Sequence, residues 1–166
     1  MIASRKWDTM PLHVVLEVNM RFAIAALLGL SLAAPHAAYA DAGSIGNAKI
    51  VNGAVSVVRN GSTVPIKLGD AVMEHDVFQT GADGSLGITF TDNTSFSLGP
   101  NSSIAVDTYF FDPKNLKGNM VAKIKKGTMM VRTGELTRQN PGSVQVKTPR
   151  TVLGVRGTTF VVSVDE

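Results

Sequence analysis

Cysteine is absent from the 166 residues, and tryptophan and histidine are rare, with one and three copies. The lack of cysteine excludes disulfide bonds, cysteine-based zinc sites, a thiol nucleophile and lipid attachment to a cysteine. His75 is the only histidine beyond residue 40, so a serine-histidine-aspartate arrangement would have a single candidate base there. Packing of apolar side chains must therefore hold the folded part of the protein together.

Long hydrophobic runs are also scarce, and the one that stands out is Phe22–Ala34. It is shorter than the ~20 apolar residues that span a membrane. It follows the positive start Met20-Arg21 and precedes the small residues of Ala38-Tyr39-Ala40, which is the order of a cleavable secretory signal. We predict a signal region over residues 1–40, with cleavage after Ala40. We expect the true start at Met20, because acidic residues precede Met20.

No second apolar segment of the length of a membrane anchor follows residue 40. We predict that residues 41–52 are an N-terminal linker, with a turn or short helix between Gly43 and Gly53. Residues 53–166 are expected to form one β domain, since their number suits a single domain. The formal net charge of +3 is spread along the chain and points only weakly to anionic partners.

Apolar and polar residues alternate through most of the chain after residue 53. In a strand, successive side chains point to opposite faces, so alternation predicts strands with one buried and one solvated face. Phe96 and Leu98, which alternate with Ser95 and Ser97, are one example. The alternating segments are residues 55–58, 86–91, 95–98, 104–106, 122–125, 129–132, 144–147 and 160–164.

Turn-forming residues separate these segments. Asn60-Gly61, Asp83-Gly84 and Asp92-Asn93 accept the positive φ of tight hairpin turns. The spacing of about 8–12 residues between strands is typical of an antiparallel sandwich or barrel. We therefore predict an all-β fold, an antiparallel β-sandwich or roll preceded by a helical signal peptide. The candidate edge strands are residues 158–164 and the lysine-rich strand around Lys123.

Catalytic and metal-binding patterns are weak. His75 lies between two acidic residues, but a solvated loop histidine is the favoured interpretation, and no G-x-S-x-G sequence is present. We predict no catalytic residue, no metal site and no cofactor. Two alternatives stay open, a calcium site and a carboxylate pair (Asp92 and Asp107) for an enzyme acting on envelope polysaccharide. The aspartates considered for calcium, for which turn formation is favoured, are Asp83, Asp92, Asp107 and Asp112.

Five residues are predicted as possible partner contacts. Arg150 and Arg156 flank a glycine-containing segment that could hold an anion, although a structural role is favoured. Lys123 and Lys125 share one face of a basic strand, which is either solvated or in contact with an anionic polymer or partner protein. Tyr109 opens the only aromatic cluster, where the core competes with partner contact.

The order of motifs from Gly53 to Glu166 resembles the FecR domain family. Each motif is weak alone, and their succession is what is specific. The motifs are Gly53-Ala54-Val55, Arg59-Asn60-Gly61, Leu68-Gly69-Asp70, Asp76-Val77-Phe78-Gln79-Thr80-Gly81, Asp83-Gly84-Ser85, Ile88-Thr89-Phe90-Thr91-Asp92-Asn93-Thr94, Leu98-Gly99-Pro100-Asn101-Ser102, Thr148-Pro149 and Gly154-Val155-Arg156-Gly157-Thr158-Thr159-Phe160.

The resemblance implies a β-rich extracytoplasmic module. Well-known members of the family receive a signal from an outer-membrane iron-chelate receptor and pass it across the membrane to a sigma factor. We expect this chain to be a stand-alone exported form without the transmembrane and anti-sigma segments. It is then a non-enzymatic periplasmic or secreted binding or sensory module whose partner is an envelope protein or cell-wall polymer, and not nucleic acid. A structural or adhesin-type subunit, or an enzyme acting on envelope polysaccharide, is the alternative.

Overall fold

The computed structural model describes residues 43–156 and 159–165, and its elements confirm the all-β prediction. The predicted signal region, with its start at Met20 and its cleavage site after Ala40, lies outside the described residues. No described helix has the length and hydrophobicity needed to cross a membrane. The elements are β1 (Gly46–Asn52), β2 (Val55–Arg59), β3 (Ser62–Pro65), β4 (Ala71–Val72), β5 (Val77–Thr80), β6 (Ser85–Phe90), β7 (Ser95–Leu98), β8 (Ser103–Asp112), β9 (Lys117–Arg132), α2 (Glu135–Gln139), β10 (Val144–Lys147), β11 (Val152–Gly154) and β12 (Thr159–Val164).

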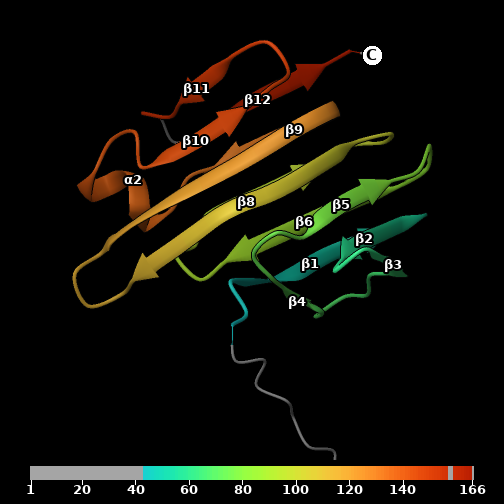
Figure 1. Ribbon diagram of the computed structural model, residues 1–166, viewed down its shortest axis with the longest axis horizontal. Coiled ribbons are helices and arrows are strands. Elements are labelled where there is room, and N and C mark those ends of the chain that lie inside the picture. The colour runs from blue at the N-terminus through green and yellow to red at the C-terminus, as the bar shows by residue number, and fades with distance from the viewer. Residues whose placement is uncertain (1–42, 157–158, 166) are drawn as a thin grey trace, which may run out of the picture. The chain divides into compact units, whose positions relative to one another are not determined.

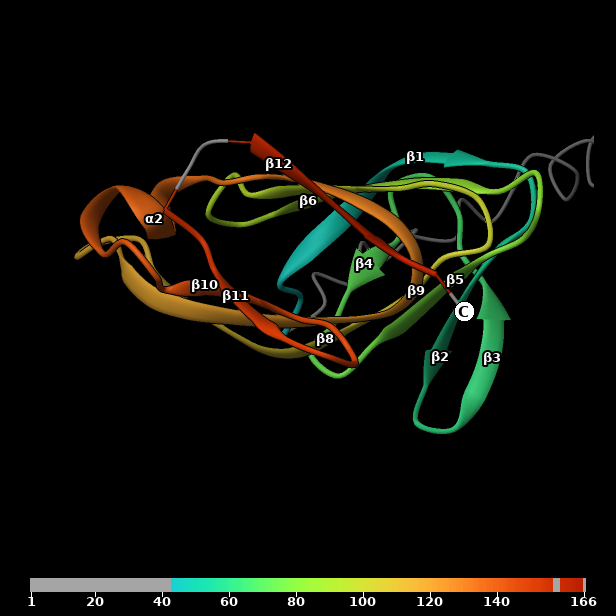
Figure 2. The same ribbon diagram turned by 90° about the horizontal axis from the view of Figure 1, so that it is seen from above.

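The strands form two sheets that share the long strand β9 (Figures 1 and 2). The first half of β9 pairs with β8 on one side and β10 on the other, and its second half pairs with β7 and β12. One sheet therefore runs β11-β10-β9-β8-β5-β2-β3, and the other runs β12-β9-β7-β6-β1-β4. All pairs are antiparallel except β10 with β9, which is parallel.

Gly127 marks the point where β9 passes from one sheet to the other. Its φ is +86°, in the left-handed region that glycine adopts without steric cost. A Cβ atom at this position would overlap the side chain of Ser102, which precedes β8. The bend therefore requires glycine, and it makes one strand serve both sheets.

The core lies between the inner faces of the two sheets, as the alternation of the sequence predicts. In β9, the buried side chains of Met120, Ala122 and Ile124 face the first sheet's interior, and those of Met129 and Val131 continue the same inward face beyond the bend. Aromatic rings add contacts between strands, since Phe90 packs edge-to-face on Phe96 and stacks on Tyr109, with centroid distances of 4.8 and 5.4 Å.

Residues 46–52 are not the predicted linker, turn or short helix. They form β1, which pairs with β6 and β4 and buries Ala48 completely. The sequence prediction was wrong because Lys49 and Ile50 are both exposed at a register irregularity, which interrupts the alternation that marks a strand. The folded domain therefore begins before Gly53.

The predicted hairpin turns are confirmed at two of three places. Asn60 and Gly61 have φ values of 51° and 78° in the β2–β3 turn, and Asn93 has a φ of 65° in the β6–β7 turn. The third, at Asp83-Gly84, joins β5 to β6 in the other sheet and is not a hairpin. The short helix α2 was not expected, since five residues are too few to show a periodic apolar face.

The two candidate edge strands have different outcomes. Strand β12 pairs with β9 alone among the described strands, which agrees with the prediction of an edge. The lysine-rich strand is the first half of β9 and lies between β8 and β10, so it is central and the edge prediction was wrong. Its lysines are exposed on the outer face of the sheet, because only one face of this strand is covered.

Candidate functional site: a basic groove beside strand β12

A groove with a volume of about 750 Å³ lies where the two sheets separate. Its size falls within the range of ~300–1,000 Å³ that is usual for ligand sites. Strand β12 forms one wall, and the turn that joins β10 to β11 forms the other, with Leu153 of β11 and Lys125 of β9. Lys125 and Arg150, two of the predicted contact residues, both line this groove.

The pairing of β9 explains why these segments meet. Strands β10 and β12 pair with the same side of β9, β10 before the bend at Gly127 and β12 after it. Lys147, the last residue of β10, is in register with Lys123, so the chain that follows it passes Lys125. Val164, near the end of β12, is in register with Gly127. The groove is thus the gap between two strands that share one neighbour.

The turn that carries Arg150 is held by its own side chains and backbone. The Thr148 N–H donates to the carbonyl oxygen of Thr151 at 2.8 Å. The Thr148 hydroxyl oxygen accepts from the N–H groups of Arg150 and Thr151 at 3.2 and 3.0 Å. This is the arrangement by which threonine stabilises a turn. The Thr148-Pro149 motif therefore fixes the loop that presents the arginine.

Two cations line the groove, and two more lie on the adjacent sheet face. Lys125 and Arg150 line it, and the neighbouring strands place Lys123 and Lys147 side by side on the same outer sheet face. None of the four forms an ion pair with a described residue. Asp165 is the acidic residue among the groove-lining side chains. The cluster is therefore a positive surface that attracts anionic groups.

The groove is partly apolar. Val161 is 62% exposed, while Val162 is buried and Val164 and Leu153 pack against the core. A site with apolar walls and charged groups suits an extended chain that carries both kinds of side chain, because each kind finds a matching surface.

Tyr109 and Arg156 lie outside the groove. Tyr109 is only 8% exposed and packs in the core, so its ring offers little surface to a partner, and the exposed ring of the cluster is that of Phe110, at 58%. Arg156 is exposed, next to the buried Val155. Among the described residues, no hydrogen bond ties the Arg156 side chain to a backbone carbonyl, so the structural role that the sequence favoured for it gains no support there.

Tyr109 takes part in a buried hydrogen-bond network around Asp92. The Tyr109 hydroxyl donates to Asp92 Oδ1 at 3.1 Å and accepts from the Asp92 N–H at 3.0 Å. Asp92 Oδ2 accepts from the Thr94 hydroxyl at 2.6 Å, and the Asp92 carbonyl accepts from the N–H of Glu135 in α2. Burial, together with the charge of Asp92, raises the pKa of Tyr109 well above its ordinary value. The network joins a turn, a strand and a helix.

Asp92 is therefore a structural residue, fully buried and surrounded by donors. Asp107, the other member of the proposed carboxylate pair, lies in β8 at a register irregularity. Two other aspartates also stabilise turns. Asp83 accepts from the Ala54 N–H, and hydrogen bonds from Asn115 and the Lys114 N–H hold the pKa of Asp112 below its ordinary value.

His75 is exposed and has a φ of 68°, in the loop before β5. Within residues 43–156 and 159–165, no three acidic or histidine side chains come together as a metal-binding group. The calcium alternative gains no support from this arrangement.

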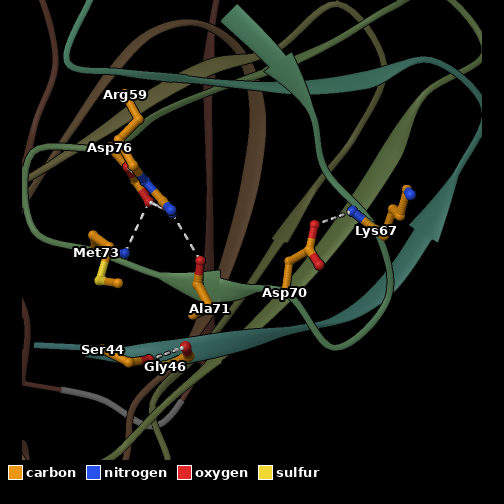
Figure 3. Close-up of polar contacts among 8 residues, drawn as sticks. All are labelled: Ser44, Gly46, Arg59, Lys67, Asp70, Ala71, Met73 and Asp76. Atoms are coloured by element: carbon orange, nitrogen blue, oxygen red, sulfur yellow. Dashed lines mark hydrogen bonds and ion pairs between the residues drawn. The ribbon is translucent and has the colours of Figure 1, made fainter. Parts of the chain in front are cut away.

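Arg59 and Asp76, from two different motifs, form an ion pair (Figure 3). Arg59 Nε donates to Asp76 Oδ1 at 2.8 Å and Nη2 to Oδ2 at 2.7 Å. The same Nη2 donates to the Ala71 carbonyl, and the Met73 N–H donates to Asp76 Oδ2, each at 2.8 Å. The Asp76 side chain is fully buried, so the pair ties β2 and β4 to the turn that precedes β5 and is structural.

A second hollow of about 740 Å³ lies beside the β2–β3 hairpin. Its lining includes Ser56, Thr63 and Gln79 but no charged residue, and none of the predicted contact residues. The groove beside β12 is the stronger candidate, because it brings two of them together.

Comparison with known proteins identifies the family. A family model described as "FecR protein" matches residues 76–166, more than half of the chain. The chain belongs to the FecR family. A solved structure titled "Cell surface anchoring domain" is 34% identical, covering 36% of this chain and 80% of that chain, with a TM-score of 0.35. No curated protein matches.

The family match of this FecR chain begins at Asp76, whereas the motif resemblance began at Gly53. The Arg59–Asp76 ion pair links the two parts, since Asp76 is the first matched residue and Arg59 lies before the match. The groove beside β12, with Lys125, Arg150 and β12 itself, lies wholly inside the matched region.

Sequence reasoning missed Leu153, which lines the groove, and Lys147, which lies on the adjacent sheet face beside Lys123. Both lie on strands that are placed here only by the parallel pairing of β10 with β9, and no local sequence pattern indicates that pairing. A parallel pair requires a long connection, and the turn and helix between β9 and β10 were the available signal.

Proposed function

We propose that this FecR-family chain is a non-enzymatic binding module of the cell envelope that holds an acidic segment of a partner protein in the groove beside β12. The observation that carries the proposal is that Lys125 and Arg150 line a groove with apolar walls, and neither forms an ion pair with a described residue. Lys123 and Lys147 lie side by side on the adjacent sheet face and add to the positive charge. Unpaired cations beside an apolar surface favour an anionic ligand that also offers apolar groups.

The envelope location is supported by the signal predicted over residues 1–40 and by the resemblance to extracytoplasmic modules. The non-enzymatic character is supported by the fate of the buried carboxylates. Asp76 and Asp92 are saturated by hydrogen bonds inside the fold and are not presented to a substrate. An acid or base must reach the group whose proton it transfers, and these two cannot.

Site-specific photocrosslinking in the exporting cell tests the proposal. A photoreactive residue at Ser163, in the groove, is expected to capture an exported protein with an acidic segment, which mass spectrometry identifies. One at Thr63 on β3 is the control, exposed but distant in the sheet order.

Charge reversal supplies the decisive comparison. The double variant Lys125→Glu/Arg150→Glu is expected to abolish the crosslink, because two attractive charges become repulsive. The matched control Lys49→Glu/Lys67→Glu changes the net charge equally at exposed lysines outside the groove and is expected to leave it unchanged. An equal loss of the crosslink in both double variants would contradict the proposal. Capture of a cell-wall polymer in place of a protein would also contradict it.

A further inference from the structure

Of the four strands that end the two sheets in the described part of the chain, β12 is the one that is left open to pairing. Strand β4 has two residues and β11 has three, and β3 ends in Pro65, which has no N–H to donate. Short strands and proline are the devices by which proteins block edge pairing. Strand β12 has six residues, Thr-Phe-Val-Val-Ser-Val, with no charge, no proline and an unbroken register against β9.

The hydrogen bonds of Thr128 fix which backbone groups of β12 point outward. The Thr128 carbonyl accepts from the Gly99 N–H, and its N–H donates to the Ser102 hydroxyl, so both groups face β7 and β8. In an antiparallel pair the facing side alternates from residue to residue, so Met129 and Val131 face β12. The full set facing β12 also includes Gly127.

The register then assigns β12. Met129 lies opposite Val162, Val131 opposite Phe160 and Gly127 opposite Val164, so the N–H and C=O groups of these three residues of β12 point to β9. The groups of the alternate residues point away from β9. These residues are Thr159, Val161 and Ser163, and two of them, Val161 and Ser163, line the basic groove.

We propose that the acidic partner binds as an added β-strand on β12, with main-chain hydrogen bonds to Thr159, Val161 and Ser163. This inference rests on the proposed function and specifies its mode of binding. An extended segment supplies alternate donors and acceptors along its length, as the outward groups of β12 require. Acidic side chains of the segment meet Lys125 and Arg150, and apolar ones meet Leu153 and Val161.

The choice of an acidic partner strand over a second copy of this chain follows from charge. Strand β12 carries no charged residue, so a second β12 offers nothing to the cations of the groove. Its one acidic neighbour among the described residues, Asp165, follows the strand end. An acidic segment neutralises the cations that a second copy leaves unpaired.

Three synthetic peptides of seven residues test the mode of binding by calorimetry with the exported protein. The first alternates valine and glutamate, the second alternates valine and lysine, and the third is the valine–glutamate peptide with every amide nitrogen methylated, so that neither of its edges can donate. The first is expected to bind, the second not to bind, and the third to bind at least about tenfold more weakly, because it cannot form the ladder. Equal affinity of the first and third peptides would overturn strand addition.

A pair of variants tests the same point from the protein side. Val161→Pro removes an outward N–H while the bonds of β12 to β9 stay in place, and Val161→Thr keeps the N–H and the branched shape. The proline variant is expected to bind the valine–glutamate peptide at least about tenfold more weakly than the unaltered protein does. The threonine variant is expected to lose less than about threefold in affinity. If proline lowers the melting temperature, the methylated peptide on the unaltered protein still decides the matter.

The two proposals can fail separately. If Lys125→Glu/Arg150→Glu abolishes binding but Val161→Pro and amide methylation do not, the groove binds an acidic ligand without adding a strand, and this inference is wrong while the proposed function stands. If no valine–glutamate peptide binds and analytical ultracentrifugation shows a dimer that Val161→Pro disrupts, the occupant of β12 is a second copy, and both proposals are wrong.

Discussion

Individual buried polar residues fix how separate chain segments join around the apolar core. Asp76 and Asp92 have no exposed surface, and each accepts hydrogen bonds from more than one chain segment. Such carboxylates are stable only with all their partners, because an unsatisfied buried charge is costly. The motifs that contain Asp76 and Asp92 therefore have a structural role.

Arg59→Met should destabilise the protein by about 2–4 kcal/mol, because it leaves the buried Asp76 carboxylate without its cation. Urea unfolding measures the change. Arg138→Met is the matched control, since Arg138 is 73% exposed in its pair with Glu135 and its loss should cost less than ~0.5 kcal/mol. Similar small effects from both substitutions would contradict a structural role for the Arg59–Asp76 pair.

Tyr109→Phe should destabilise the protein by about 1–3 kcal/mol at neutral pH, since it removes the hydroxyl that serves the Asp92 N–H and carboxylate. The substitution should also change the response to alkali. Because the folded pKa of Tyr109 lies above the ordinary value of 10.0, the unfolded chain loses its proton first, and stability falls as the pH rises above about 10.

Denaturant unfolding between pH 8 and pH 11 checks the second effect. Tyr109 is the only tyrosine beyond residue 40, so the phenylalanine variant should lose less stability over this range than the unaltered protein. Parallel losses in the two proteins would show that Tyr109 does not ionise differently on folding.

Among the elements, β9 has the largest influence on the architecture. It is one continuous strand in the structure, whereas the sequence predicted two, at residues 122–125 and 129–132. The alternation of buried and exposed side chains is interrupted at Lys125, Lys126 and Gly127, which is where the strand bends between the sheets. A local pattern shows such an interruption equally at a bend and at a loop.

Gly127→Ala should destabilise the protein by at least about 2 kcal/mol, because alanine is strained at a φ of +86° and its Cβ overlaps Ser102. Thermal unfolding measures the loss. Gly99→Ala is the control, since its Cβ would lie 3.8 Å from the nearest atoms, those of Thr128, and it should change stability by less than ~1 kcal/mol. A tolerated Gly127→Ala would mean that the bend does not depend on this conformation.

At the scale of the whole molecule, β1 places the start of the domain before Gly53. A chain shortened to begin at Gly53 lacks the strand that pairs with β6 and β4, and Ala48 no longer fills its buried position. It should unfold without a cooperative transition, while a chain beginning at Asp41 unfolds cooperatively. Calorimetry of both measures this. Equal melting temperatures would show that β1 is dispensable.

The fold class, most strands and two of the hairpin turns could be predicted from the sequence, because alternation and turn chemistry are local. For the groove, the sequence indicated some of the residues but not that they lie close together. Lys125 and Arg150 were both identified, but their meeting depends on β10 returning parallel to β9 after the helix α2. The core position of Tyr109 likewise depends on Asp92, which is distant in the sequence. Contacts of this kind follow from topology and leave no periodic signature.

Amide hydrogen exchange measured by NMR, with and without the valine–glutamate peptide, tests the central claim most directly. In the free protein, the amides of Phe160, Val162 and Val164 should exchange slowly because they bond to β9, and those of Thr159, Val161 and Ser163 should exchange fast. Addition of the peptide should slow the second set and leave the first unchanged. Unchanged fast exchange at Val161 and Ser163 with the peptide bound would contradict the account.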